Sequence, residues 1–257
     1  MAVFCWLLFL VSALAQEPLS DAVQLDRGEP EELFLRANQA YEADDHDLAI
    51  RLYEQLIAQD VVSGPIYYNM GNSHLRSGSL GQAIAAYRQA RFLSPRDEDV
   101  RANMDFARKS AKDAIVPQQA SPLLRTAFFW HFLLSRHELA QALAVFNLLF
   151  FAALVWRRFR RESEIARWCV ACSGLPLLAL AISLTVKTFL PVDVAVVGSP
   201  EMKVYSGMAK DTVVRFALHE GTEAKLIEVS GYWALISLSD GKRGWVQRGD
   251  IIELRLK

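Results

Sequence analysis

GNSHLRSGSLGQAIAAYRQARFLSP, residues 71–95, contains two short amphipathic helical patterns, separated by Ser77-Gly78 and followed by Pro95. Shifted by 34 residues, this stretch matches an earlier part of the chain, so that Asn38 and Tyr53 recur as Asn72 and Tyr87. A fixed period of this length is typical of arrays of helical hairpins, in which each hairpin buries its apolar face against the next. The sequence therefore predicts an α-helical solenoid over residues 30–116.

The second copy resembles a tetratricopeptide repeat at seven signature places: Tyr67, Met70, Gly71, Ala83, Tyr87, Ala90 and Pro95. It departs from that family at His74, where an aromatic residue is usual. The first copy, residues 30–63, is looser and has no closing Pro. A third helical pattern over residues 97–115 has acidic residues in its first turn, where they favour helix formation. We expect it to cap the short array.

The resemblance to tetratricopeptide repeats implies a protein-binding groove, lined here by Phe34, Asn38, Tyr41, Glu42, Tyr68, Asn72, Leu75 and Arg76. The basic clamp with which some family members hold a terminal carboxylate is not expected, because Phe34, Asp99 and Asn103 occupy its places. One end of the predicted array is acidic (Glu29, Glu31, Glu32, Glu42, Asp44, Asp45 and Asp47) and the other is basic (Arg88, Arg91 and Arg96). These charges are either ordinary solvated faces or steer a partner.

Three apolar windows indicate membrane targeting. Residues 1–15 are short, apolar and end in a small-x-small pattern, which predicts a secretory signal peptide or, alternatively, an uncleaved anchor. Residues 138–156 and 168–190 are long enough to cross a bilayer as helices. The loop between them, residues 157–167, is rich in arginine, which predicts that it stays in the cytoplasm. The clustered residues are Arg157, Arg158, Arg160, Arg161 and Arg167.

This topology predicts a membrane protein whose two flanking domains both lie outside the cytoplasm, which in a bacterium is the periplasmic side of the inner membrane. Residues 122–137, just before the first predicted span, contain Phe128, Phe129, Trp130 and Phe132 but are too short to cross the membrane. We expect an interfacial segment with its aromatic residues at headgroup depth. The alternative is that this segment packs on the soluble domain.

Residues 192–257 consist of short β-rich runs between turn signals, among them Asp240-Gly241 at a hairpin position. We predict a small all-β barrel. The region resembles the bacterial SH3-like family through Ser206-Gly207, residues 218–222, Tyr232-Trp233 and residues 240–246, and departs from it at Tyr205 and Met208. Trp233 and Trp245 are interpreted either as core fillers or as a ligand platform.

The sequence contains no motif that indicates an enzyme. It has no Gly-rich phosphate loop, no nucleophile elbow and no metal-ligand spacing, so neither a metal nor a cofactor is expected. Cys169 and Cys172 share a helix face, which is compatible with membrane packing or, with further ligands, a redox or metal role. The formal net charge of −1 gives no reason to expect a nucleic-acid partner.

The order of these modules resembles the BatE family of bacterial aerotolerance operons. That resemblance implies a membrane complex with von Willebrand factor A domain proteins, other Bat proteins and a MoxR-type AAA ATPase. We therefore expect a non-enzymatic scaffold for protein–protein interactions. The alternative is a sensor or tether of the cell wall, in which the SH3-like domain binds peptidoglycan.

Overall fold

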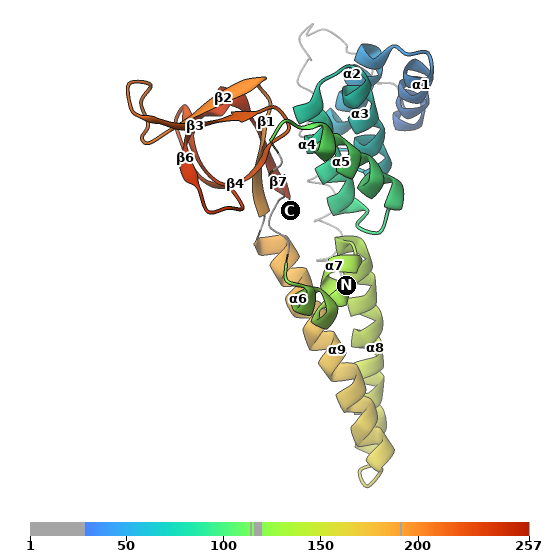
Figure 1. Cartoon of the computed structure of the whole chain (residues 1–257). Coiled ribbons are helices and arrows are strands. Elements are labelled where there is room, and N and C mark those ends of the chain that lie inside the picture. The colour runs from blue at the N-terminus through green and yellow to red at the C-terminus, as the bar shows by residue number, and fades with distance from the viewer. Residues whose placement is uncertain (1–28, 114, 116–119, 191, 257) are drawn as a thin grey trace, which may run out of the picture.

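The computed structural model describes residues 29–113, 115, 120–190 and 192–256. The predicted signal peptide lies outside these residues. The described chain forms a helical region, a hairpin of two long helices and an antiparallel sheet (Figure 1). The helical region and the sheet lie side by side at one end of the long hairpin, and the turn of that hairpin lies at the opposite end. The protein is thus a mixed helix-and-sheet molecule.

As the periodicity predicts, the first four helices form two hairpins, α1 (Pro30–Glu42) with α2 (His46–Ala58) and α3 (Gly64–Arg76) with α4 (Leu80–Leu93). A single helix, α5 (Glu98–Ser110), follows them. The side chains of Asp45 and Asp97 accept hydrogen bonds from backbone N–H groups in the first turns of α2 and α5, and so cap these helices. Gly78, with φ +82°, makes the turn between α3 and α4 in a conformation that favours glycine.

Small residues set the distance between paired helices. A Cβ atom on Gly71 of α3 would lie 2.7 Å from the ring of Tyr87 on α4, closer than packed atoms tolerate. Ala37 and Ala49 are fully buried where α1 meets α2. The largest buried side chains in this region, Tyr53 and Tyr87, fill the spaces that these small residues leave.

Two helices, α8 (Arg136–Phe159) and α9 (Glu164–Phe189), are long and apolar enough to cross a membrane. They begin a few residues before the predicted spans, because Ser135 and Ser163 cap their first turns through their side-chain oxygens. Residues 160–163 alone connect them, so the predicted loop over residues 157–167 is shorter than expected. Arg160 and Arg161 lie in this turn. The other three clustered arginines lie within the adjoining helix turns: Arg157, Arg158 and Arg167.

The segment before α8 forms two short helices, α6 (Pro122–Ala127) and α7 (Phe129–Leu133). Trp130 Nε1 donates a hydrogen bond to Ser183 Oγ of α9 over 3.1 Å, and the ring nitrogen Nδ1 of His131 lies 3.2 Å from the same oxygen. Lys187 Nζ, near the end of α9, donates to the Leu134 carbonyl over 2.6 Å. These contacts hold α7 beside the last turns of α9.

The sheet contains seven strands: β1 (Val192–Val197), β2 (Glu201–Tyr205), β3 (Val214–His219), β4 (Glu223–Ser230), β5 (Trp233–Ser237), β6 (Arg243–Gln247) and β7 (Ile251–Leu256). A 3₁₀ turn, η1 (Arg248–Asp250), precedes β7. The strand order is β3-β2-β6-β5-β4-β1-β7, with antiparallel pairing throughout. Gly241, with φ +86°, lies in the β5–β6 hairpin at the position predicted from Asp-Gly.

The prediction of a closed barrel is wrong for the described residues, because β3 and β7 are the ends of the hydrogen-bonded order and do not pair with each other. Strand β1 is covered on both of its faces. Ala195 and Val197 face the core of the sheet, whereas Val194 and Val196 face the helical region. A strand covered on both sides reads as a continuous apolar run, as this one does.

Candidate partner-binding face and its junction with the sheet

Asn38 of α1 joins three helices through its side-chain oxygen. It accepts a hydrogen bond from the Tyr53 hydroxyl of α2 over 2.6 Å and another from Asn69 Nδ2 of α3 over 2.9 Å. Burial raises the pKa of the Tyr53 hydroxyl to about 12, so this group remains a donor at neutral pH. The amide therefore connects the first hairpin internally and also links it to the second.

The same network recurs 34 residues later. Asn72 of α3 accepts from the Tyr87 hydroxyl of α4 over 2.8 Å and from Asn103 Nδ2 of α5 over 2.9 Å. Asn103 also donates to the Tyr68 hydroxyl over 3.1 Å. Because Asn103 takes the place that Asn69 has in the first network, α5 occupies the position of the first helix of a third hairpin.

Two aromatic pairs flank these networks at the same spacing. The rings of Phe34 and Tyr53 lie 6.2 Å apart between centroids, and those of Tyr68 and Tyr87 lie 6.2 Å apart. We call the two networks and their aromatic pairs the asparagine ladder. The 34-residue period predicts that Asn38 and Asn72 are equivalent, but the parts that Asn69 and Asn103 play in these networks were not predicted, although the same shift relates them.

The predicted groove residues have unequal access to a partner. Glu42 and Arg76 are exposed, and Phe34, Tyr41 and Tyr68 are half-buried. The remaining three are engaged within the protein: Asn38 and Asn72 in the ladder, and Leu75 against an apolar cluster that includes the sheet. The structure thus brings the predicted residues together along α1 and α3, but several of them hold the helices in place.

The two charged ends of the array differ. All seven acidic residues of the first end are exposed: Glu29, Glu31, Glu32, Glu42, Asp44, Asp45 and Asp47. At the basic end, Arg88 pairs with Glu223 of the sheet, Arg96 pairs with Glu138 of α8, and Arg91 lines a cavity. Within the described chain, only the acidic end therefore offers an open charged surface to a partner.

The helical region docks on the sheet through a shared apolar cluster. Ile84, Tyr87 and Met104 from α4 and α5 pack with side chains of β1 and β7. The strand residues in this cluster are Val194, Val196, Ile252, Leu254 and Leu256. A Cβ atom on Gly81 would lie 2.4 Å from the Val197 carbonyl oxygen, so the start of α4 approaches the end of β1 closely. A two-hairpin array thus gains its missing buried surface from the sheet.

A buried carboxylate lies at the centre of this junction. Glu223 of β4, only 3% exposed at its side chain, pairs with Arg88 of α4 and accepts a 2.6 Å hydrogen bond from Arg108 Nε of α5. Burial alone would raise the pKa of the Glu223 carboxyl, but the charges and hydrogen bonds of Arg88 and Arg108 outweigh it and lower the pKa. The carboxylate is therefore ionised and paired at neutral pH.

A second polar contact lies at the end of α5. Asp113 accepts hydrogen bonds from the backbone N–H of His219 over 2.7 Å and from Thr222 Oγ1 over 2.6 Å, and its other oxygen lies 2.9 Å from His219 Nδ1. Glu220 in the same β3–β4 connection accepts from the backbone N–H of Gly81 over 2.9 Å. The segment that resembles an SH3-like motif, residues 218–222, therefore also holds the helices, beside β1, β7 and Glu223.

Phe216 packs against the core of the sheet, but the two tryptophans do not belong to this core cluster. In the β5–β6 register, Ala234 pairs with Val246 and both are fully buried, whereas Trp233 and Trp245 alternate with them and are only half-buried. The rings of Tyr205 and Trp233 lie 5.5 Å apart, edge to face. We call Tyr205, Trp233 and Trp245 the aromatic patch. The core-filler interpretation of the two tryptophans is wrong because their strand register places them on the opposite face.

No cluster of three or more His, Cys, Asp or Glu side chains in the described residues is arranged to hold a metal ion. Cys169 is half-buried and Cys172 is exposed, both on α9. Comparison with known proteins finds no protein-family model that matches the chain and no curated protein similar enough to be matched.

Proposed function

We propose that this protein is a non-enzymatic membrane scaffold that holds a partner protein against its helical region. The observation that carries the proposal is the fixed docking of two folded regions on each other at one end of two long apolar helices (Figure 1). An arrangement of this kind presents a preformed surface at a defined height above a bilayer. Preformed surfaces bind with a smaller entropic cost than surfaces that must order on binding.

The topology follows from charge. The α8–α9 turn and the helix ends beside it contain five arginines, and short loops rich in arginine stay in the cytoplasm. The opposite end, which carries both folded regions, then lies in the periplasm of the bacterial inner membrane. The N-terminal apolar stretch expected to act as a signal peptide supports the same orientation.

The kind of partner follows from the resemblances. The 34-residue recurrence of the asparagine ladder supports a tetratricopeptide array, a class of fold that binds proteins. The module order resembles the BatE family, whose setting implies von Willebrand factor A domain proteins, other Bat proteins and a MoxR-type ATPase. We propose a protein of the first class as the direct partner.

The partner-binding face lies along α1. Glu31, Leu35 and Glu42 are exposed and share one side of this helix, since their spacings of four and seven residues return to the same face. Leu35 is 56% exposed, and the half-buried Phe34 and Tyr41 lie beside it. This surface combines apolar contact area with negative charge, and so suits a partner with a basic rim around an apolar centre.

A photocrosslinking amino acid at Glu42 in intact cells tests this assignment. The matched control is the same probe at Glu54, which is exposed on α2. We expect the Glu42 probe to capture a von Willebrand factor A domain protein, identified by mass spectrometry, and the double substitution Glu31→Lys, Glu42→Lys to reduce its capture. Equal capture from the two positions would contradict the proposed face.

The aromatic patch favours a second candidate function, a cell-wall tether. Half-buried aromatic rings that share one face of a sheet are suited to stacking on sugar rings, and peptidoglycan offers such sugars. The full chain in detergent, mixed with purified sacculi, would then sediment with them, and the Trp233→Ala variant would stay in solution. If both remain in the supernatant, the tether function is excluded and the scaffold function is unaffected.

A further inference from the structure

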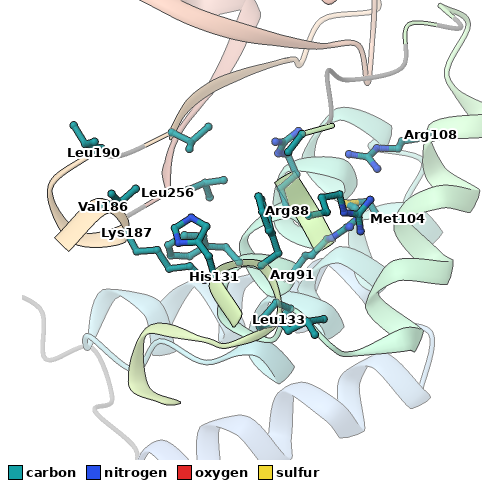
Figure 2. Close-up of a pocket in the computed structure, with 16 residues that line it drawn as sticks. Arg88, Arg91, Met104, Arg108, His131, Leu133, Val186, Lys187, Leu190 and Leu256 are labelled. Atoms are coloured by element: carbon teal, nitrogen blue, oxygen red, sulfur yellow. The ribbon is translucent and has the colours of Figure 1, made fainter. Parts of the chain in front are cut away.

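A cavity of about 430 Å³ lies where the helical region, the sheet and the end of α9 meet (Figure 2). Its walls come from α4, α5, α6, α7, α9, β1 and β7. None of the modules expected from the sequence contains such a site, because the cavity exists only where they join.

The polar lining of this cavity is cationic. It includes five basic side chains and no acidic one among the described residues: Arg88, Arg91, Arg108, Arg125 and Lys187. Two of the five have carboxylate partners outside the lining: Glu223 pairs with Arg88 and Arg108, and Asp105 pairs with Arg108 over 3.4 Å. Arg91 and Lys187 form no ion pair within the described chain. The cavity therefore keeps an excess of positive charge at these two residues.

Arg91 shows this excess most clearly. It forms no hydrogen bond or ion pair within the described chain, although it is half-buried. Burial, followed by the positive charge of Arg108, lowers the pKa of the Arg91 guanidinium, and the negative charge of Asp105 offsets this only partly. An anion in the cavity would offset the unfavourable burial of this positive charge beside Arg108.

Apart from His131, the remaining lining is apolar and includes Phe92, Met104, Leu133, Val186, Leu190 and Leu256. Phe132 of α7 also lines the cavity, and the α6–α7 segment exposes further apolar side chains: Leu123, Leu124, Phe128 and Phe129. A ligand that suits both halves of this lining must combine an anionic group with a hydrocarbon part.

The depth of the cavity matches the surface of a bilayer. The 26 residues of α9 extend about 39 Å at about 1.5 Å per residue, against a hydrocarbon core of about 30 Å. Its last turn, with Val186, Lys187 and the adjoining Leu190, therefore reaches the headgroup region. Trp130 and His131 hold α7 to Ser183 about 9 Å below the end of α9, by the same rise per residue.

We propose that the cavity binds an acidic phospholipid, with the headgroup phosphate on Arg91 and Lys187 and the acyl chains running down the exposed side of α9. Arginine recognises phosphate oxygens through two parallel N–H donors, which suits Arg91. A zwitterionic lipid would bring its own cation next to the five basic side chains, which repel it. The bound lipid would join the docked domains to the membrane surface.

The test compares lipids retained by the full chain after purification from mixed membranes of phosphatidylglycerol and phosphatidylcholine, measured by native mass spectrometry. We expect the protein to retain phosphatidylglycerol selectively. The Arg91→Gln variant should retain about tenfold less, the loss of one charge-assisted pair. The matched control is Arg51→Gln, an exposed arginine on α2. It should behave as the unchanged protein.

Further arms keep the result interpretable. The arginines at the α8–α9 turn attract acidic lipids by surface charge alone, so only the difference between the Arg91 and Arg51 variants reports on the cavity. Arg91→Lys should recover part of the binding if Arg91→Gln folds poorly. Equal lipid retention in the Arg91→Gln and Arg51→Gln variants would overturn the proposal. Displacement of phosphatidylglycerol by millimolar inorganic phosphate would overturn the lipid as the source of the phosphate group.

Discussion

Glu223, in the first position of β4, forms an ion pair with Arg88 of α4, a residue 135 positions earlier in the chain. Arg108 of α5 forms a second ion pair with the same carboxylate. The whole hairpin of long apolar helices lies between these residues in the sequence. The contact therefore joins the sheet directly to the helical region, without involving the long helices.

Replacement of Glu223 by Gln should destabilise the docked arrangement. Arg88 would then be largely buried without a counter-charge, and Arg108 would keep only the more exposed Asp105, a situation that costs about 3 kcal/mol. The thermal unfolding midpoint of the full chain in detergent, followed by tryptophan fluorescence, should fall by about 9 °C. The matched variant Glu228→Gln changes an exposed residue of the same strand and should leave the midpoint within error. A similar midpoint for both variants would contradict this role.

Acid should weaken the same junction. The folded-state pKa of Glu223 lies below the ordinary 4.5, and that of Asp113 lies below 3.8, because their partners outweigh the effect of burial. A depressed carboxyl pKa stabilises the folded state above the unfolded pKa, and this stability is lost as the pH falls through the folded value. The difference in unfolding midpoint between the unchanged protein and Glu223→Gln should thus be constant above about pH 5 and shrink below about pH 4.5. A difference independent of pH would exclude this linkage.

Loss of the Asn72 side chain should disrupt the asparagine ladder. Asn72→Ala leaves the Tyr87 hydroxyl and Asn103 amide without their acceptor, which costs about 1–3 kcal/mol for buried groups. Thermal unfolding should report this loss, whereas Gln39→Ala on the exposed side of α1 should have little effect. If Asn72→Ala instead weakened partner capture at unchanged stability, its role would be that of a groove residue.

A methyl group at Gly81 should separate α4 from the sheet. The added Cβ in Gly81→Ala would lie 2.4 Å from the Val197 carbonyl oxygen, which is backbone and cannot rotate away. We expect limited proteolysis to cut between the helical region and the sheet faster in this variant. Gly249→Ala is the matched control, because nothing lies within 4 Å of the added Cβ there. Equal cleavage rates would show that the junction tolerates the methyl group.

The proposed topology predicts the labelling of single cysteines placed in a chain without native cysteine. A membrane-impermeant maleimide applied to intact spheroplasts should react at Tyr232→Cys, whose native side chain is 89% exposed in the β4–β5 turn. It should reach Arg160→Cys, in the α8–α9 turn, only after permeabilisation. The opposite pattern would reverse the orientation.

The helices and their crossings could be predicted from sequence because their information is local and repeated. Tyr53 and Tyr87 stand at equivalent places, and the 34-residue shift that finds them also relates Asn69 to Asn103. The long apolar helices could also be predicted, because the exclusion of charged residues over a whole span is a strong sequence signal. Their first residues differ from prediction because a single serine cap decides where each helix begins.

The junction could not be predicted in this way. Arg88 looks like any exposed helical arginine until its partner on β4 is known, and no local pattern links residues so far apart. The one sequence feature that pointed to the junction was the apolar run of β1, whose lack of alternation indicates burial on both faces. For Trp233 and Trp245, composition favoured the core, and only the register of β5 with β6 places them outside it.

Docking on β1 and β7 also has a consequence for the order of synthesis. The apolar side of α4 leaves the ribosome well before the strands that cover it, with both long helices made in between. A nascent chain that stalls after α9 therefore carries a finished helical array with its sheet-facing side bare. Export and folding of this protein must accommodate that interval.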